Sequence, residues 1–138
     1  MTEDECNQIL NSNPLDNYAR FRLSEIWFDE ERNFEQAERL LESIEKSEPN
    51  FLKGEAKELL GDIAYHDTNM NYESAKEFYL AALKCKPNSA DLYVKVGKCH
   101  EKLREFDDAI VVLKKALKRD KSNFVANYKL GLVYIRNN

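Results

Sequence analysis

Apolar residues recur along the chain at the three- and four-residue spacing of an amphipathic helix, and segments with this pattern alternate with short polar breaks. The breaks fall at residues 47–50, 86–89 and 120–123. Asn and Ser in these breaks can cap a following helix, and Pro cannot continue a preceding one. The pattern therefore predicts a series of helices joined by short turns.

The predicted helices come in pairs. The first helix of each pair is predicted over 18–29, 55–66, 90–102 and 124–136. The second helices carry the clearest apolar stripes, which are Phe34, Ala37, Leu40, Leu41 and Ile44; Tyr72, Ala75, Phe78, Tyr79 and Ala82; and Phe106, Ala109, Ile110, Leu113, Ala116 and Leu117. Residues 3–12 are predicted to belong to the second helix of a preceding pair.

Small residues recur at a nearly constant spacing. The intervals are 36 and 34 residues for Gly61, Gly97 and Gly131, and 38 and 34 residues for Ala37, Ala75 and Ala109. A period near 34 is typical of helical repeat arrays, in which each helix pair stacks on its neighbours. Small side chains at these points would let antiparallel helices approach closely.

These positions resemble the tetratricopeptide repeat (TPR), a 34-residue unit of two antiparallel helices. The third repeat fits that pattern without a gap, at Tyr93, Val96, Gly97, His100, Phe106, Ala109, Leu113 and Ala116, with Lys121 replacing Pro. The second repeat has two extra residues in the turn at 66–71, and the first repeat has one extra residue. Ser24 and Ile44 replace the family's Gly and Ala, which predicts wider helix spacing in the first repeat.

The resemblance implies an all-α fold, a right-handed superhelical solenoid of TPR-like antiparallel helix pairs. Residues 1–138 are expected to form a single domain. Its repeats are predicted at 17–51, 54–89 and 90–123, with a partial helix or cap at 3–12. Residues 124–138 would form the first helix of a fourth repeat or a C-terminal cap.

Composition narrows the class of protein. The 138 residues are 43% hydrophobic and 33% charged, which suits a folded helical domain. The aliphatic run at 109–113 is too short to cross a membrane, and no basic-then-apolar leader opens the chain. Cys6, Cys85 and Cys99 are odd in number and lack metal or redox spacing, so we expect reduced thiols. These features predict no membrane partner and a cytoplasmic location, with the nucleus also open.

The sequence gives little support for catalysis or metal binding. His66, His100 and Cys99 are the plausible metal ligands, but zinc sites need four ligands at tight spacing, so packing roles are favoured. The chain has no nucleophile elbow, phosphate loop or zinc-protease motif, so we expect no enzyme activity and no cofactor. The basic stretch 114–121 lacks interleaved aromatic residues, which favours a solvated helix face over nucleic-acid binding.

The resemblance also implies which side chains line the concave groove. The predicted partner-binding residues are Phe21, Glu25, Phe28, Glu58, Asp62, Tyr65, Lys95, Lys98, Lys102, Tyr128 and Lys129, and His66 maps to the same face. Residues 1–69 hold 17 acids and 7 bases, whereas residues 70–138 hold 8 acids and 14 bases. We therefore expect a groove that runs from acidic to basic and binds a peptide or partner helix of opposite charge order. The alternative is that Phe21 and Phe28 belong partly to the core and that the charges only solvate the helices.

One subclass of this family binds the C-terminal carboxylate of heat-shock chaperones through Lys, Asn and Arg in the groove. The corresponding positions are Phe21, Glu25 and Leu59, or, one repeat later, Glu58, Asp62 and Lys95. Acids at these positions would repel a carboxylate. The sequence therefore predicts a protein-interaction scaffold of a multiprotein complex that does not bind chaperone tails.

Self-assembly is the alternative function. The last predicted helix keeps Leu132, Val133 and Ile135 on a face that a further helix would normally cover. This basic, apolar end and the acidic front end are complementary head to tail, so a homo-oligomer through the C-terminal helix is the second hypothesis. A third hypothesis is a recruiting module joined to an enzyme in a longer chain.

Overall fold

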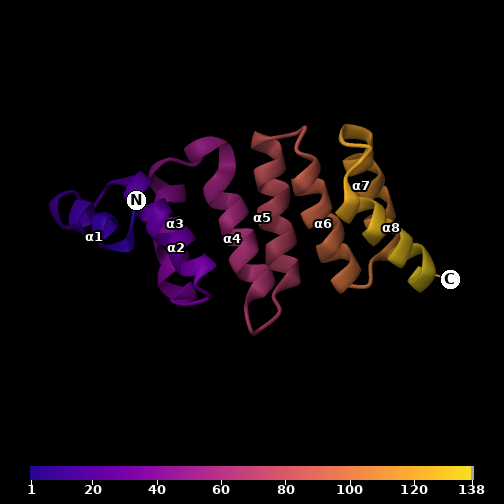
Figure 1. Cartoon of the computed structure of the whole chain (residues 1–138), viewed down its shortest axis with the longest axis horizontal. Helices are drawn as coiled ribbons and strands as arrows, with labels where there is room; N and C mark the ends of the chain where they lie inside the picture. Colours follow the sequence, from indigo (N-terminus) through magenta and orange to yellow (C-terminus); the bar gives the residue numbers. More distant parts are fainter. Residues whose placement is uncertain (138) are drawn as a thin grey trace.

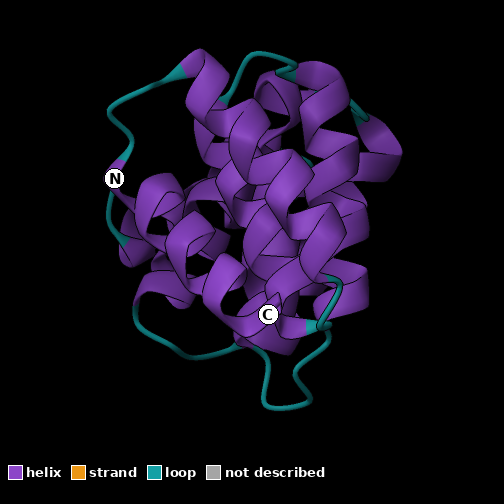
Figure 2. Cartoon of the chain, turned by 90° about the vertical axis from the view of Figure 1, so that its right-hand side faces the viewer, coloured by secondary structure: helices purple, strands orange, loops and turns teal. Residues whose placement is uncertain are grey.

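The computed structural model describes residues 1–137, and these residues form eight α-helices and no strand. The helices are α1 (Glu3–Ser12), α2 (Asn17–Asp29), α3 (Phe34–Ser47), α4 (Glu55–His66), α5 (Tyr72–Cys85), α6 (Ala90–Lys102), α7 (Phe106–Arg119) and α8 (Phe124–Asn137). Each helix packs on its neighbours in the chain, so that α1 and α8 lie at opposite ends of a row (Figure 1). Viewed along this row, the connecting loops lie at the periphery of the helices (Figure 2). The predicted all-α solenoid is confirmed.

Polar residues in the breaks start the helices as their chemistry requires. The side chain of Ser89 accepts a hydrogen bond from the Leu92 amide at 3.2 Å, and Asn123 accepts one from the Ala126 amide at 2.9 Å. These bonds satisfy amides that have no partner inside the helix. Thr2 and Glu5 form a reciprocal capping box at the start of α1.

The turn before α4 is built differently from the other breaks. In this turn, η1 (Phe51–Gly54), the φ angles of Leu52, Lys53 and Gly54 are 46°, 56° and 89°, which places three consecutive residues in the left-handed region. A Cβ on Gly54 would lie 2.9 Å from the Cβ of Cys85 in α5. Glycine at this position therefore serves both the backbone conformation and the close approach to α5.

Apolar side chains fill the space between successive helices. One cluster joins α2, α3, η1 and α4, a second joins α4, α5 and α6, and smaller clusters join α6, α7 and α8. Ser24 replaces the repeat glycine in α2, and its buried hydroxyl donates to the carbonyl of Arg20 at 2.9 Å. Among the described helices, none combines the length and the apolar character that a membrane crossing requires.

Helix α8 corrects one expectation. Val133 was expected on an exposed face, but it is fully buried against Ala109 and Leu113 of α7. Val133 and Ile135 are two positions apart and so lie on nearly opposite sides of the helix, which leaves Ile135 73% exposed. Leu132 is half-buried.

Candidate partner-binding groove

A row of aromatic rings crosses the first and second helix pairs. Ring centroids are 6.0 Å apart for Phe34 and Phe28, 5.7 Å for Phe28 and His66, and 5.2 Å for His66 and Tyr65. Tyr65 then meets Tyr72 edge-on, also at 5.2 Å. The rings come from α2, α3, α4 and α5, so the row depends on the stacking of two repeats.

Two hollows open along this row. The first has a volume of about 220 Å³ and is lined by Phe28, Asp62, Tyr65, His66, Tyr79, Lys95 and Lys98. The second measures about 530 Å³ and is lined by Phe28, Asp29, Glu31, Phe34, His66 and Thr68. Phe28 and His66 form the wall between them. Apolar walls with a few converging polar groups are typical of binding sites.

Asp62 of the first hollow and the nearby Glu58 are both bound by a lysine from the next repeat. The ammonium of Lys95 lies 2.9 Å from an oxygen of Asp62 and 3.0 Å from an oxygen of Glu58. The hydroxyl of Tyr79 donates to the same Asp62 carboxylate at 2.7 Å. Burial disfavours the charged ammonium, but attraction to Asp62 and hydrogen bonds to both carboxylates outweigh this effect and raise the pKa of Lys95. Both carboxylates are thus paired within the protein, and Lys95 compensates one of their two negative charges.

Lys98 is placed very differently. Its ammonium stands 5.2 Å from the ring centroid of Tyr65, and within residues 1–137 it forms no ion pair. Burial, followed by repulsion from Lys129 and Lys95, lowers the pKa of Lys98 below its usual value. Burial also raises the pKa of Tyr65 to about 12.

Farther along the groove, a buried carboxylate holds the basic residues of α8. Glu101 is 4% exposed and accepts a hydrogen bond from Lys129 at 2.9 Å, with Arg136 at 3.7 Å. Lys102 is exposed, and its ammonium lies 6.0 Å from the ring centroid of Tyr72. Tyr128 is 56% exposed and stacks on Phe124 with centroids 6.2 Å apart.

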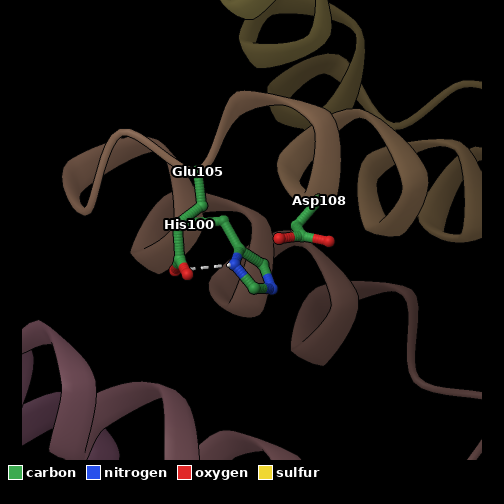
Figure 3. Close-up of side chains that lie close together, drawn as sticks. All are labelled: His100, Glu105 and Asp108. Carbon is green, nitrogen blue, oxygen red and sulfur yellow. Dashed lines mark hydrogen bonds and ion pairs between the residues drawn. The ribbon is translucent and has the colours of Figure 1, made fainter.

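A separate cluster at the turn between α6 and α7 contains metal-ligating side chains. His100, Glu105 and Asp108 have ligand atoms within 4.8 Å of one another (Figure 3). The ring nitrogen Nδ1 of His100 lies 3.1 Å from Glu105, and the ammonium of Lys76 lies 3.0 Å from the same carboxylate oxygen. A cation at this carboxylate would have to compete with Lys76, so we interpret the cluster as a link between α5 and the start of α7.

Known sequences and structures show what this arrangement is similar to. The sequence pattern described as "Tetratricopeptide repeat" matches residues 28–90 and again residues 90–123, which together are well over half of the chain. The chain belongs to the tetratricopeptide repeat family.

One curated relative and two solved structures illustrate what the chain is similar to. FK506-binding protein 5 from Rhizopus delemar is 31% identical over 72 residues, which are 46% of this chain and 19% of that protein. The chain therefore spans only about a fifth of that relative. The crystal structure of MamA superimposes with a TM-score of 0.84 at 20% identity, covering 96% of this chain and 70% of MamA. That of YrrB, described as "a TPR protein with an unusual peptide-binding site", gives 0.82 at 15% identity, covering 99% and 68%. At these identities the structural matches show a shared fold.

The TPR stack brings together five of the predicted groove residues. Phe28, Asp62, Tyr65, Lys95 and Lys98 surround the first hollow. Glu58 joins them through Lys95. The remaining predicted residues lie at the edges or away from this hollow, namely Glu25 beside Arg22, Lys102 over Tyr72, Lys129 on Glu101, and Tyr128 on Phe124.

Phe21 belongs mainly to the core. It is 5% exposed, and its ring lies 5.8 Å from that of Phe51. It also borders a third hollow, of about 230 Å³, which it shares with Glu25 and Glu58. The prediction of Phe21 as a partner-binding anchor is thus corrected, because the turn η1 places Phe51 against it.

Two residues of the TPR groove wall were assigned to helix packing from the sequence. Phe34 and Tyr79 occupy the apolar stripes of second helices, yet each lines one of the hollows. The sequence carried no separate signal for them, because a position on a second-helix stripe predicts packing alone.

Proposed function

We propose that this chain is a non-enzymatic protein-interaction scaffold that binds a peptide or partner helix in its concave groove, within a multiprotein complex. The observation that carries the proposal is the first hollow, where Phe28, Tyr65 and His66 form apolar walls beside Lys98. Aromatic residues at such places contribute most of the affinity in protein interfaces. YrrB, a TPR protein of the same fold, is described as having a peptide-binding site, which supports the proposal.

The proposal is tested by selecting peptides from a random display library against the whole chain and measuring their affinity. We expect selected peptides to lose about tenfold or more in affinity for Phe28→Ala. The matched control is Leu80→Ala, which alters a side chain on α5 that is 43% exposed and lines no hollow described above. Melting temperatures of both variants verify that they fold. Failure to select any peptide, or equal losses for the two variants, would overturn groove binding.

Self-assembly is a second candidate because of one surface on α8. Phe124, Tyr128 and Ile135 are 78%, 56% and 73% exposed. Contiguous apolar surface of this kind favours association. Sedimentation over a range of protein and salt concentrations tests the idea, with Ile135→Glu expected to abolish any dimer. A monomer at all concentrations would exclude this candidate.

A further inference from the structure

The charges of the groove are not equally available to a partner. All three acids predicted to bind a partner are already paired inside the protein: Glu25 with Arg22, and Glu58 and Asp62 with Lys95. The sequence alone suggested an acidic end that would attract basic residues of a ligand. Internal pairing removes most of that attraction, because a ligand cation would have to displace Lys95 from two carboxylates.

The lysines predicted to bind a partner, unlike the acids, are only partly paired. Lys95 and Lys129 are held by carboxylates, whereas Lys98 and Lys102 form no ion pair within residues 1–137 and stand over the rings of Tyr65 and Tyr72. Lys98 also lines another hollow, together with Asp91. Asp91 is exposed and forms no ion pair with Lys98. The unpaired charge along the middle of the groove is therefore positive.

Lys98 has a physical reason to take an anionic partner. It is half-buried, and its neighbours Lys95 and Lys129 are like charges that, together with burial, lower its pKa. Lys95 and Lys129 are themselves paired with carboxylates, so burial is the larger penalty on the charge of Lys98, and a carboxylate beside it would offset the lost hydration. Asp62 lines the same hollow and attracts Lys98, but it is paired with Lys95, so the ammonium of Lys98 remains available to a bound anion.

The first hollow, which Lys98 also lines, favours a second chemical group on the ligand. Its walls are the rings of Phe28, Tyr65 and His66, with a volume of about 220 Å³. A single bulky apolar or aromatic side chain fits this chemistry, since aromatic rings pair favourably in tilted arrangements. Lys98 lines the same hollow, so the two groups of a ligand must be adjacent.

We propose that the groove binds an internal peptide segment in which a bulky apolar side chain is flanked by acidic residues. The apolar side chain enters the hollow between Phe28, Tyr65 and His66, and a flanking carboxylate pairs with Lys98, with Lys102 as the next cation along the groove. This inference rests on the proposed function, because it specifies the ligand of the same groove.

The test uses pools of short peptides with acetylated N-termini and amidated C-termini, so that every carboxylate belongs to a side chain. The central triplet is Glu-Trp-Glu, Gln-Trp-Gln, Lys-Trp-Lys or Glu-Ala-Glu, with random flanking residues. Retention on the immobilised whole chain should be about tenfold higher for Glu-Trp-Glu than for each other pool. The preference over the Gln and Lys pools should shrink between about 50 and 500 mM salt, whereas the preference over Glu-Ala-Glu should not.

Variants of the chain test whether Lys98 causes the preference for acidic peptides. Lys98→Met keeps the length and apolar stem of the side chain, so the fold is retained, and it should reduce the preference for Glu-Trp-Glu over Gln-Trp-Gln to less than about threefold. The matched control is Lys118→Gln, which removes an exposed charge in the last turn of α7 and should leave the preference unchanged.

Two outcomes separate the two proposals. Equal retention of the Glu, Gln and Lys pools, with loss of all three in Phe28→Ala, would overturn the acidic preference while leaving groove binding intact. Retention of no pool, or the same loss for Lys118→Gln as for Lys98→Met, would overturn this inference, and the display selection would then decide the broader function separately.

Discussion

Gly97 in α6 and Gly131 in α8 occupy equivalent positions 34 residues apart, yet their surroundings are opposite. A Cβ on Gly97 would lie 2.8 Å from both Cγ and Cδ2 of Leu113, which is fully buried. A Cβ on Gly131 would have no neighbouring atom within 4 Å. The same residue at the same repeat position is thus a packing requirement in one helix and an open site in the other.

The difference shows why a small residue recurs at this position of the repeat. Gly97 is needed because the second helix of its pair, α7, lies directly against it. No described helix covers the corresponding face of α8, so Gly131 is exposed. A repeat pattern read from sequence therefore marks the places where a partner helix can pack, and the structure shows which of those places are filled.

The largest expected effect breaks this comparison directly. Gly97→Ala should destabilise the fold by about 2 kcal/mol, because the branch point of Leu113 cannot move away in a packed core. Gly131→Ala should instead stabilise by about 0.5 kcal/mol, since alanine replaces glycine in an open helix position. Urea denaturation of the two variants measures the difference. Equal changes of the same sign would contradict the assigned packing.

The turn η1 extends the comparison to a third glycine. Gly54→Ala should cost about 2 kcal/mol, because it combines a φ of 89° with a Cβ only 2.9 Å from that of Cys85. Lys53→Gly is the matched control of opposite sign: Lys53 has a φ of 56° and is exposed, so glycine there should stabilise by about 0.5 kcal/mol. Thermal melts of both variants are the measurement, and a harmless Gly54→Ala would argue against the left-handed turn.

The pH dependence of folding stability tests the contacts in the well-packed middle of the stack, which differs from α8. A hydrogen bond from Lys76 lowers the pKa of Glu105 against the opposing effect of burial, and His100 adds to the lowering. A carboxylate with a lowered folded-state pKa stabilises the fold above its unfolded value of 4.5, and this contribution is lost as the pH falls through the folded value.

The corresponding variant is Glu105→Gln. It should be less stable than the wild-type chain at pH 7 by less than about 1 kcal/mol, since the carboxylate is more than a third exposed and screened by solvent. The two proteins should converge below pH 4.5. Glu35→Gln, which breaks the exposed pair with Arg39, serves as the control and should show little change at any pH.

Thiol reactivity provides the smallest and most local test. Burial raises the pKa of Cys99 to about 12 and also raises the pKa of the fully buried Cys6, whereas Cys85 is only half-buried. A thiol reagent at neutral pH should therefore modify one cysteine rapidly and two slowly. Cys85→Ser should remove the fast phase. Rapid modification of Cys99 would mean that the packing of α6 opens far more readily than the structure indicates.

Much of the fold was predictable from local spacing. The first helices expected at 55–66 and 90–102 match α4 (Glu55–His66) and α6 (Ala90–Lys102), because apolar periodicity and capping residues are properties of neighbouring positions. The turn η1 was not predicted, since nothing in Leu52 or Lys53 marks a left-handed backbone. Their conformation depends on docking Phe51 into the core next to Phe21.

The candidate site was predicted only in part. Position within the repeat placed Phe28, Asp62, Tyr65, Lys95 and Lys98 on one face, and they do line one hollow. Their ion pairing could not be predicted from the sequence, because Lys95 pairs with Glu58 and Asp62, which lie 37 and 33 positions away in the chain. Counting charges along the chain suggested a gradient that these contacts largely cancel.

The sequence by itself determined that this chain is a stack of TPR helix pairs, because a periodic pattern of small and apolar residues allows only neighbouring helices to bury their stripes. Only the tertiary structure decided which side chains remain free for a partner. Burial and ion pairing depend on atoms that come together across repeats. These contacts bury Phe21 and Val133 in the core and leave Lys98 without an ion pair among the described residues.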